Sequence, residues 1–301
     1  MSSSAATKAE ASDVVCGWCG VAGVDNIELE DCGGCDLVKY CGYKCRKQHW
    51  HWHIAECKKR AQDLHDKKLF KQPERSHLGE CPLCFLPMPL DQKKYAYYSC
   101  CSKIACKGCI YANVKSSGNF NCPFCRESAP DEEEIVKRKM KMKRIKANDP
   151  AAMREMGTEC YHKGDYDVAF EYWTKAAELG DAVAHYQLAD SYDEGGVVEK
   201  DEKKAVYHWE KAAIGGDPEA RHNLGCVEEE NGNIERSVKH FIIAANLGFE
   251  KSMKELWDHY SAGNITKEDL EATLRTHHAA INEMKSPERD AAEKLGIVFL
   301  G

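Results

Sequence analysis

The chain has 301 residues, 30% of them charged, and a formal net charge of -7 at pH 7. This length predicts about two domains. No apolar run approaches the roughly 18 residues that cross a bilayer, which excludes a membrane span in the sequence given. The acidic balance gives no overall reason to expect nucleic-acid binding.

Residues 1–13 are rich in Ser and Ala and lack an apolar segment behind a basic patch, so we expect a disordered tail rather than a secretory signal. Of the 17 cysteines, 15 lie between Cys16 and Cys125. A disulfide framework is one interpretation, but it suits an exported chain. Cysteines in C-x-x-C pairs with a well-placed histidine instead favour zinc in an intracellular protein, either cytoplasmic or nuclear.

The first cysteine cluster lies within residues 14–60, and we expect its last helix to continue to about residue 70. Seven cysteines and one histidine supply eight ligands, enough for two tetrahedral zinc sites. Several of the later ligands are separated by multiples of four residues, which places them on one face of a helix. The expected ligands are Cys16, Cys19, Cys32, Cys35, Cys41, Cys45, His53 and Cys57.

The order of these ligands, with Tyr40 before Cys41 and Trp50 before His53, resembles a MYND finger over 42 residues. The resemblance implies interleaved sites. Cys16, Cys19, Cys41 and Cys45 would hold one zinc ion, and Cys32, Cys35, His53 and Cys57 the other. MYND fingers bind peptides, often proline-containing ones, so the resemblance implies such a partner. His49 and His51 exceed the ligand count, and we expect them at the surface.

The second cluster lies within residues 78–129 and contains the other eight clustered cysteines. Its middle, YSCCSKIACKGC, resembles the middle of a RING-type zinc module. In such modules a His or Cys ligand stands two residues after the cysteine that corresponds to Cys101, but this chain has Lys103 at that position. A protonated Lys103 does not ligate zinc, and no histidine lies between His77 and His162. Either Cys100 replaces the missing ligand or one zinc ion keeps an open position. We expect Cys100 to be the ligand because structural zinc sites are closed.

Apart from Lys103, this cluster resembles a RING finger. The resemblance implies one site at Cys81, Cys84, Cys106 and Cys109 and another at Cys100, Cys101, Cys122 and Cys125. RING fingers commonly dock a ubiquitin-conjugating enzyme and act as ubiquitin ligases by positioning it. Leu83, Pro123 and Arg126 match the docking positions, and we expect Leu83 to be exposed. The alternative is a non-catalytic adaptor whose fingers bind peptides or are structural.

Residues 130–148 predict a charged connector helix. Acidic residues at its start and basic residues at its end suit the helix dipole. The run KRKMKMKRIK is also compatible with a nuclear import signal or a nucleic-acid patch. We favour a solvated helix and therefore do not expect nucleic acid as a partner.

Residues 149–301 contain an internal repeat. YWTKAAELGD at 172–181 recurs as HWEKAAIGGD at 208–217 and more weakly as HFIIAANLGF at 240–249. Periods of this length predict stacked helix pairs. The unit resembles the Sel-one-like repeat, a relative of the tetratricopeptide repeat. We expect three units over 149–249, then a degenerate unit and capping helices to about Phe299.

We single out four of the cysteine and histidine side chains of this region and expect none of them to be a metal ligand. Cys160 and Cys226 are expected in the core of the repeats, and His277 and His278 at the surface.

The sequence therefore predicts a multidomain protein. Two small cross-braced α+β zinc fingers, holding four zinc ions, precede an all-α helical-repeat solenoid. Its partners are expected to be proteins or peptides, because helical-repeat solenoids offer them a concave surface. The repeats contain no P-loop and no H-E-x-x-H motif. We expect the zinc modules and the repeats to be independent of each other.

Overall fold

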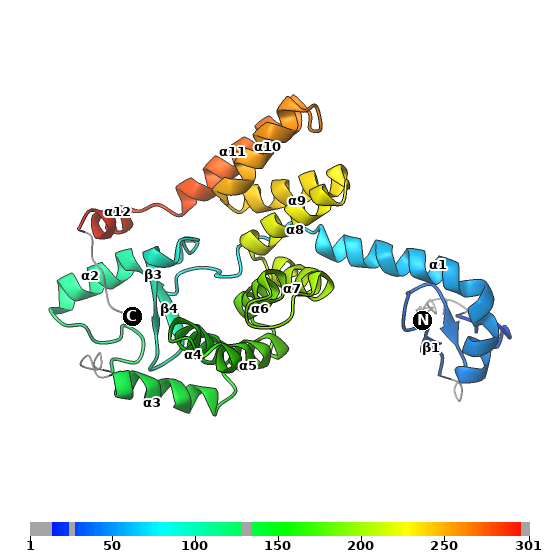
Figure 1. The fold of residues 1–301 in the computed structure, drawn as a ribbon, viewed down its shortest axis with the longest axis horizontal. Helices are drawn as coiled ribbons and strands as arrows, with labels where there is room; N and C mark the ends of the chain where they lie inside the picture. Colours follow the sequence, from blue (N-terminus) through cyan, green and yellow to red (C-terminus); the bar gives the residue numbers. More distant parts are fainter. Residues whose placement is uncertain (1–13, 24–27, 128–133, 296–301) are drawn as a thin grey trace, which may run out of the picture. The chain divides into compact units, whose positions relative to one another are not determined.

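The computed structural model describes residues 14–23, 28–127 and 134–295. The tail expected over 1–13 and the end of the capping segment near Phe299 lie outside these residues. The chain divides into two compact units, Met1–Leu69 and Phe70–Gly301 (Figure 1). Within the described ranges, no helix is both long and apolar enough to cross a membrane.

The first unit is a small two-stranded finger followed by one long helix. Strand β1 (Glu30–Asp31) pairs antiparallel with β2 (Lys39–Tyr40), and α1 covers Tyr43–Leu69. Its core contains four buried cysteines around the fully buried Tyr40. So small a core buries too little apolar surface to stabilise the folded module. Modules of this kind therefore depend on the binding free energy of a metal ion.

The second unit begins with another finger. After the short 3-10 helix η1 (Gln92–Lys94), β3 (Tyr95–Tyr98) pairs antiparallel with β4 (Lys103–Cys106), and α2 (Lys107–Ser117) follows directly. Cys106 therefore lies at the end of β4 and at the N-terminus of α2. The core around Cys106 is again small and contains Met88, Ala105 and Ile110 beside cysteines.

Six helices of equal length form the repeats, and they pack as antiparallel pairs. They are α4 (Pro150–His162) with α5 (Tyr166–Glu178), α6 (Ala182–Glu194) with α7 (Glu202–Ile214), and α8 (Pro218–Glu230) with α9 (Ile234–Asn246). Asp149, Asp181 and Asp217 each cap the first helix of a pair by accepting a hydrogen bond from the backbone N–H three residues later. The recurring aspartate therefore sets where each repeat begins.

Within a pair, a small residue on the first helix lies under an aromatic ring on the second. A Cβ atom on Gly157 would come within 2.6 Å of the Trp173 ring, and one on Gly225 within 2.6 Å of Phe241. Trp173 and Phe241 are both buried. In the first and third pairs, the repeat period thus keeps the aromatic residue opposite a glycine, which allows close helix approach.

Four further helices flank the repeats: α3 (Glu134–Ile145), α10 (Glu250–Ser261), α11 (Lys267–Glu283) and α12 (Pro287–Lys294). The connector α3 is not simply solvated as expected, because Lys141 is 4% exposed and forms an ion pair with Glu159 of α4. Thr266 caps α11 by accepting a hydrogen bond from the backbone N–H of Asp269.

Among the four side chains set aside above, one expectation is wrong. His277 is buried, with Nδ1 2.8 Å from the carbonyl oxygen of Ala245 and Nε2 2.9 Å from Glu250. A helix face that packs against the preceding pair buries His277, whereas the adjacent His278 is exposed. Cys160 is buried in the core of the first pair, and Cys226 packs against the core of the last.

The second finger lies along the inner side of the row of repeat helices (Figure 1). Arg144 of α3 donates to the carbonyl oxygen of Cys101, and the backbone N–H of His77 donates to the carbonyl oxygen of Gly216, between α7 and α8. Arg289 of α12 donates to the carbonyl oxygen of Pro87. The expected independence of the modules therefore fails for this finger, which is built into the repeat unit.

Candidate metal centres

Four groups of potential metal ligands occur among the described residues, and in each group the ligand atoms lie within 4.8 Å of one another. Two groups are in the first finger and two in the second. The groups are Cys16, Cys19, Cys41 and Cys45; Cys32, Cys35, His53 and Cys57; Cys81, Cys84, Cys106 and Cys109; and Cys100, Cys101, Cys122 and Cys125. In both fingers, the first and third ligand pairs in chain order meet at one site, and the second and fourth at the other.

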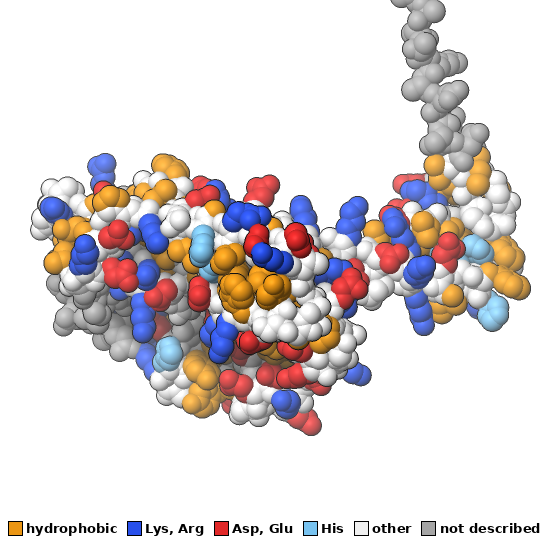
Figure 2. Space-filling model, turned by 90° about the horizontal axis from the view of Figure 1, so that it is seen from above, with side chains coloured by type: hydrophobic (Ala, Val, Ile, Leu, Met, Phe, Trp, Pro, Cys, Tyr) orange, Lys and Arg blue, Asp and Glu red, His pale blue; other side chains and the backbone are white. Residues whose placement is uncertain are grey.

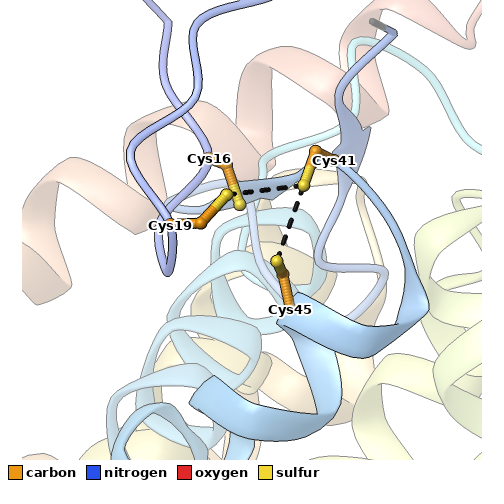
Figure 3. A group of neighbouring side chains, drawn as sticks. All are labelled: Cys16, Cys19, Cys41 and Cys45. Atoms are coloured by element: carbon orange, nitrogen blue, oxygen red, sulfur yellow. Dashed lines mark hydrogen bonds between the residues drawn. The ribbon is translucent and has the colours of Figure 1, made fainter.

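The sulfur spacing in the first finger fits zinc. A tetrahedral site with Zn–S bonds of about 2.3 Å places its sulfurs about 3.8 Å apart. The Sγ atoms of Cys19 and Cys41 are 3.6 Å apart, and those of Cys41 and Cys45 are 3.5 Å apart (Figure 3). Disulfide sulfurs would be about 2.05 Å apart, and all 17 cysteines are free.

His53 completes the second site of this finger. Its Nε2 atom is 3.3 Å from the Sγ atoms of both Cys32 and Cys35. The helix α1 carries His53 and Cys57 one turn apart, so both side chains reach the same site. His49, one turn earlier, instead stacks on His53 and hydrogen-bonds the Tyr40 hydroxyl over 2.9 Å. It is therefore a neighbour of the site, half-buried rather than at the surface as expected, while His51 is exposed.

The second finger has the same sulfur spacing. At one site the Sγ atoms of Cys81 and Cys109 are 3.8 Å apart, and those of Cys84 and Cys106 are 3.9 Å apart. At the other site, Cys101 and Cys122 are separated by 3.7 Å. Both groups therefore fit a zinc ion with four sulfur ligands.

Cys100, not residue 103, lies at the second of these sites. The Sγ atom of Cys100 is 3.4 Å from that of Cys125. Lys103 begins β4, and its Nζ atom lies 5.0 Å from the centre of the Phe124 ring. The lysine thus makes a cation–π contact instead of facing the sulfurs.

The protonation of the thiols shows why these groups need a cation. A hydrogen bond from Cys106 lowers the pKa of Cys81 to about 4, while burial raises the pKa of Cys109 to about 12. In the first finger, the hydrogen bond with Cys41 raises the pKa of Cys45 to about 12. Four neighbouring thiols therefore do not ionise together near neutral pH unless a metal ion offsets their charge.

Three of the cysteine pairs share one turn. The residue after the second cysteine donates its N–H to the carbonyl oxygen of the first, over 2.8 to 3.0 Å. That residue has a positive φ: 71° at Gly20, 57° at Phe85 and 61° at Arg126. Glycine is the usual residue in this conformation. Phe85 and Arg126 therefore occupy positions where a side chain carries a conformational cost.

The three expected docking residues, Leu83, Pro123 and Arg126, differ in solvent exposure. Arg126 is exposed and Pro123 is half-buried. Leu83 was expected to be exposed, but it is half-buried against the core of the finger. The large exposed apolar side chain of this loop is Phe85, at 72%. Sequence reasoning missed it, although its place directly after a C-x-x-C pair was visible.

Comparison with known families agrees with these modules. Residues 16–57 match the MYND finger, and residues 150–181, 182–217 and 218–249 match the Sel1 repeat. The chain therefore contains a MYND finger and three Sel1 repeats, with four clusters compatible with zinc, two of them in the MYND finger. The expected order of a cysteine-rich, strand-containing region followed by a helical-repeat solenoid is confirmed.

Two solved structures resemble part of the chain. A Sel1 repeat protein from Oxalobacter formigenes is 26% identical over 58% of this chain and 71% of its own, with a TM-score of 0.44. The protective antigen c5321 of uropathogenic Escherichia coli is 27% identical over 49% of this chain and 33% of its own, with a TM-score of 0.40. No curated protein matches the chain.

MYND fingers and Sel1 repeats are protein-interaction modules. The class defined by fold and sites is thus a zinc-binding protein-interaction protein.

Proposed function

We propose that the second finger is a RING-type ubiquitin ligase module, which positions a ubiquitin-charged conjugating enzyme while the MYND finger binds a peptide. The observation that carries the proposal is the interleaving of two four-cysteine groups over residues 81–125. This is the cross-braced order that the RING resemblance implies. We assign the sixteen clustered side chains as ligands of four zinc ions.

The proposed mechanism is positioning, not nucleophilic catalysis. Each group already supplies four ligands, so a bound zinc ion has no open position for water or substrate. The fifteen clustered cysteines are thereby engaged as thiolates. The finger would accelerate transfer by holding the charged enzyme in a reactive geometry.

Phe85 and Arg126 are the side chains best placed to contact that enzyme. Both lie directly after a zinc-binding pair and are exposed. Both have a positive φ, which costs of order 1 kcal/mol or more for a non-glycine residue. The cost supports a role for the side chains, because Gly20 shows the same turn built with glycine. Leu83 contributes the partly exposed apolar surface next to them.

The MYND finger offers aromatic rings to a peptide. Trp18, Trp50 and Trp52 are exposed, and apolar side chains are visible over this finger in Figure 2. Flat aromatic surfaces suit proline-containing segments, which lose little conformational entropy on binding. We therefore propose a proline-containing peptide as its partner.

A non-catalytic adaptor is the second candidate, and two observations favour it. Leu83 is half-buried against the core of the finger. Helix α12 also packs against α2, so part of the finger's surface is occupied by the chain itself. In this case both fingers would be structural or peptide-binding.

Discharge of ubiquitin from a panel of charged conjugating enzymes onto free lysine tests the ligase. Phe85→Gly should weaken binding of the enzyme by about 1–3 kcal/mol, the range for an interface anchor. Arg126→Gly should slow discharge and spare binding. Both changes remove the conformational strain of a positive φ, so the zinc content should stay at four ions per chain. Asn148→Gly is the matched control, because Asn148 also has a positive φ but lies outside the finger.

Cys106→Ser should lose both binding and discharge, since it removes a zinc ligand from this finger. If neither the wild type nor any full-length variant accelerates discharge from an enzyme in a broad panel, the adaptor is the correct interpretation.

A further inference from the structure

The side chain of Arg289 makes most of the hydrogen bonds between the short helix α12 and the second finger. Its Nη1 atom donates to the carbonyl oxygens of Pro87, at 2.8 Å, and Met284, at 2.6 Å. Its Nη2 atom lies 3.4 Å from both the Sγ atom of Cys84 and the carbonyl oxygen of Leu86. One guanidinium group thus joins the end of α11 to the first zinc-binding loop of the finger.

The backbone of α12 approaches α2 closely at Gly108. A Cβ atom on Gly108 would lie 2.7 Å from the backbone nitrogen of Arg289 and 2.9 Å from its Cα atom. Gly108 is in the first turn of α2, between the two cysteines of the third pair. The absence of a side chain at this position is therefore what lets α12 lie on α2.

The other contacts of α12 are weak. Ala292 is its one buried residue, and the ion pair between Lys94 and Glu293 is exposed. Exposed ion pairs of this kind contribute roughly 0–1 kcal/mol. A helix of eight residues is not stable alone in water. The position of α12 therefore depends on Arg289 and on the close fit at Gly108.

Arg289 also matches the charge of the site it contacts. A zinc ion held by these four cysteines as thiolates would give the site a net charge of -2, and the guanidinium of Arg289 donates to Cys84, one of the four. Such charge-assisted hydrogen bonds are stronger than neutral ones. The attachment of α12 therefore depends on the folded conformation of the loop Cys84–Pro87, which Arg289 contacts at three points.

We propose that α12 is an autoinhibitory strap that covers the second finger and controls access of the conjugating enzyme. The proposal rests on the proposed ligase function. Even a small, transient protein interface buries several hundred Å² on each partner, more than Leu83 and Phe85 provide. An enzyme that engages these residues must extend over the adjoining surfaces, and α12 lies there, against the carbonyl oxygens of Leu86 and Pro87 and against α2. Release of α12 exposes that surface.

Two substitutions should detach α12 from the second finger, one in α12 and one in α2. Arg289→Ala removes its hydrogen bonds, and Gly108→Ala places a methyl group against its backbone. Alanine favours helix over glycine by about 1 kcal/mol, so Gly108→Ala should leave α2 folded. Arg275→Ala is the control, because the exposed Arg275 pairs with Glu271 on its own helix. Zinc content should remain four in all three full-length variants.

Hydrogen exchange of α2 and α12 and ubiquitin discharge are measured on the same samples. We expect both released variants, and not the control, to exchange faster in these helices and to discharge ubiquitin several-fold faster than the wild type. Unchanged exchange in both variants overturns the strap. Faster exchange with discharge equal to that of an active wild type overturns its inhibitory role and leaves the ligase intact. No discharge by any protein overturns the ligase function and the regulation together, while the exchange data still report the contact.

Discussion

Cys100 and Cys101 are neighbours in the chain, and both sulfurs face the same site in the turn between β3 and β4. The turn makes this possible because Ser102, directly after them, has a φ of 56°. Its hydroxyl group lies 2.9 Å from that of Tyr97, which fixes the turn on the hairpin. Two adjacent thiolates can therefore replace the usual spaced pair.

Removing Cys100 should remove one zinc ion. Cys100→Ser leaves three strong ligands and an open position, so metal analysis of the purified protein should fall from four zinc ions per chain toward three. Cys160→Ser is the control, because Cys160 is buried in the repeat core far along the chain from the sites. Four tightly bound zinc ions in Cys100→Ser would show that Cys100 is not a ligand.

The same residues show what the sequence could predict. Counting cysteines was enough to select Cys100, because eight thiols remained for eight ligand positions. The exposure of Leu83 and Phe85 could not be predicted in this way. It depends on how the turn after Cys84 directs alternate side chains toward a core that only the folded finger defines. His277 failed for a similar reason, because its burial depends on the neighbouring helix pair.

At the scale of the helices, the spacing of small and aromatic residues defines the repeat. Each first helix carries Gly or Ala where the second carries Trp or Phe. The recurring decapeptide therefore predicted the helix pairs correctly. The position of α3 was harder to predict, since its basic run suits a solvated surface equally well.

Gly157→Ala should destabilise the repeats. The added methyl group would lie 2.6 Å from the ring of Trp173, which is buried and cannot move away. Overpacking of this kind costs about 1–3 kcal/mol, partly offset by the higher helix propensity of alanine. Urea unfolding followed by far-ultraviolet circular dichroism should show a lower midpoint. Gly196→Ala, whose methyl group would meet no atom within 4 Å, should leave the midpoint unchanged; equal midpoints for the two variants would refute the packing argument.

The repeats should also lose stability in acid through His208. Burial, with His185 and Lys204 nearby, lowers the pKa of His208 to about 4. In the unfolded chain this pKa is about 6.5. The unfolded state therefore binds the proton first, so the contribution to stability is complete above about pH 6.5 and is lost as the pH falls toward 4.

His208→Gln should remove this dependence. Between pH 7 and pH 5, the wild type should lose about 1–2 kcal/mol more of its free energy of unfolding than the variant. His278→Gln, at an exposed position, should behave like the wild type. Because the zinc sites are unchanged in both variants, their own acid sensitivity cancels in the comparison. If His208→Gln and the wild type had the same dependence of the free energy of unfolding on pH, His208 would not be the source of the acid sensitivity.

At the scale of the whole molecule, the two fingers differ in their relation to the repeats. The MYND finger has a core made only of residues from its own unit. The second finger contacts the repeat unit through α3, through the segment between α7 and α8, and through α12. Zinc in the second finger should therefore help to hold the repeat helices in place, because metal binding in such small modules is coupled to folding.

Hydrogen exchange of the repeat helices in two matched zinc-ligand variants tests this claim most directly. Cys106→Ser removes a ligand from the second finger, and Cys41→Ser removes one from the MYND finger. Both should lower the zinc content. We predict faster exchange in α4, α8 and α12 for Cys106→Ser and wild-type exchange in these helices for Cys41→Ser. Wild-type exchange of all three helices in Cys106→Ser, despite lost zinc, would contradict the claim that the finger and the repeats form one unit.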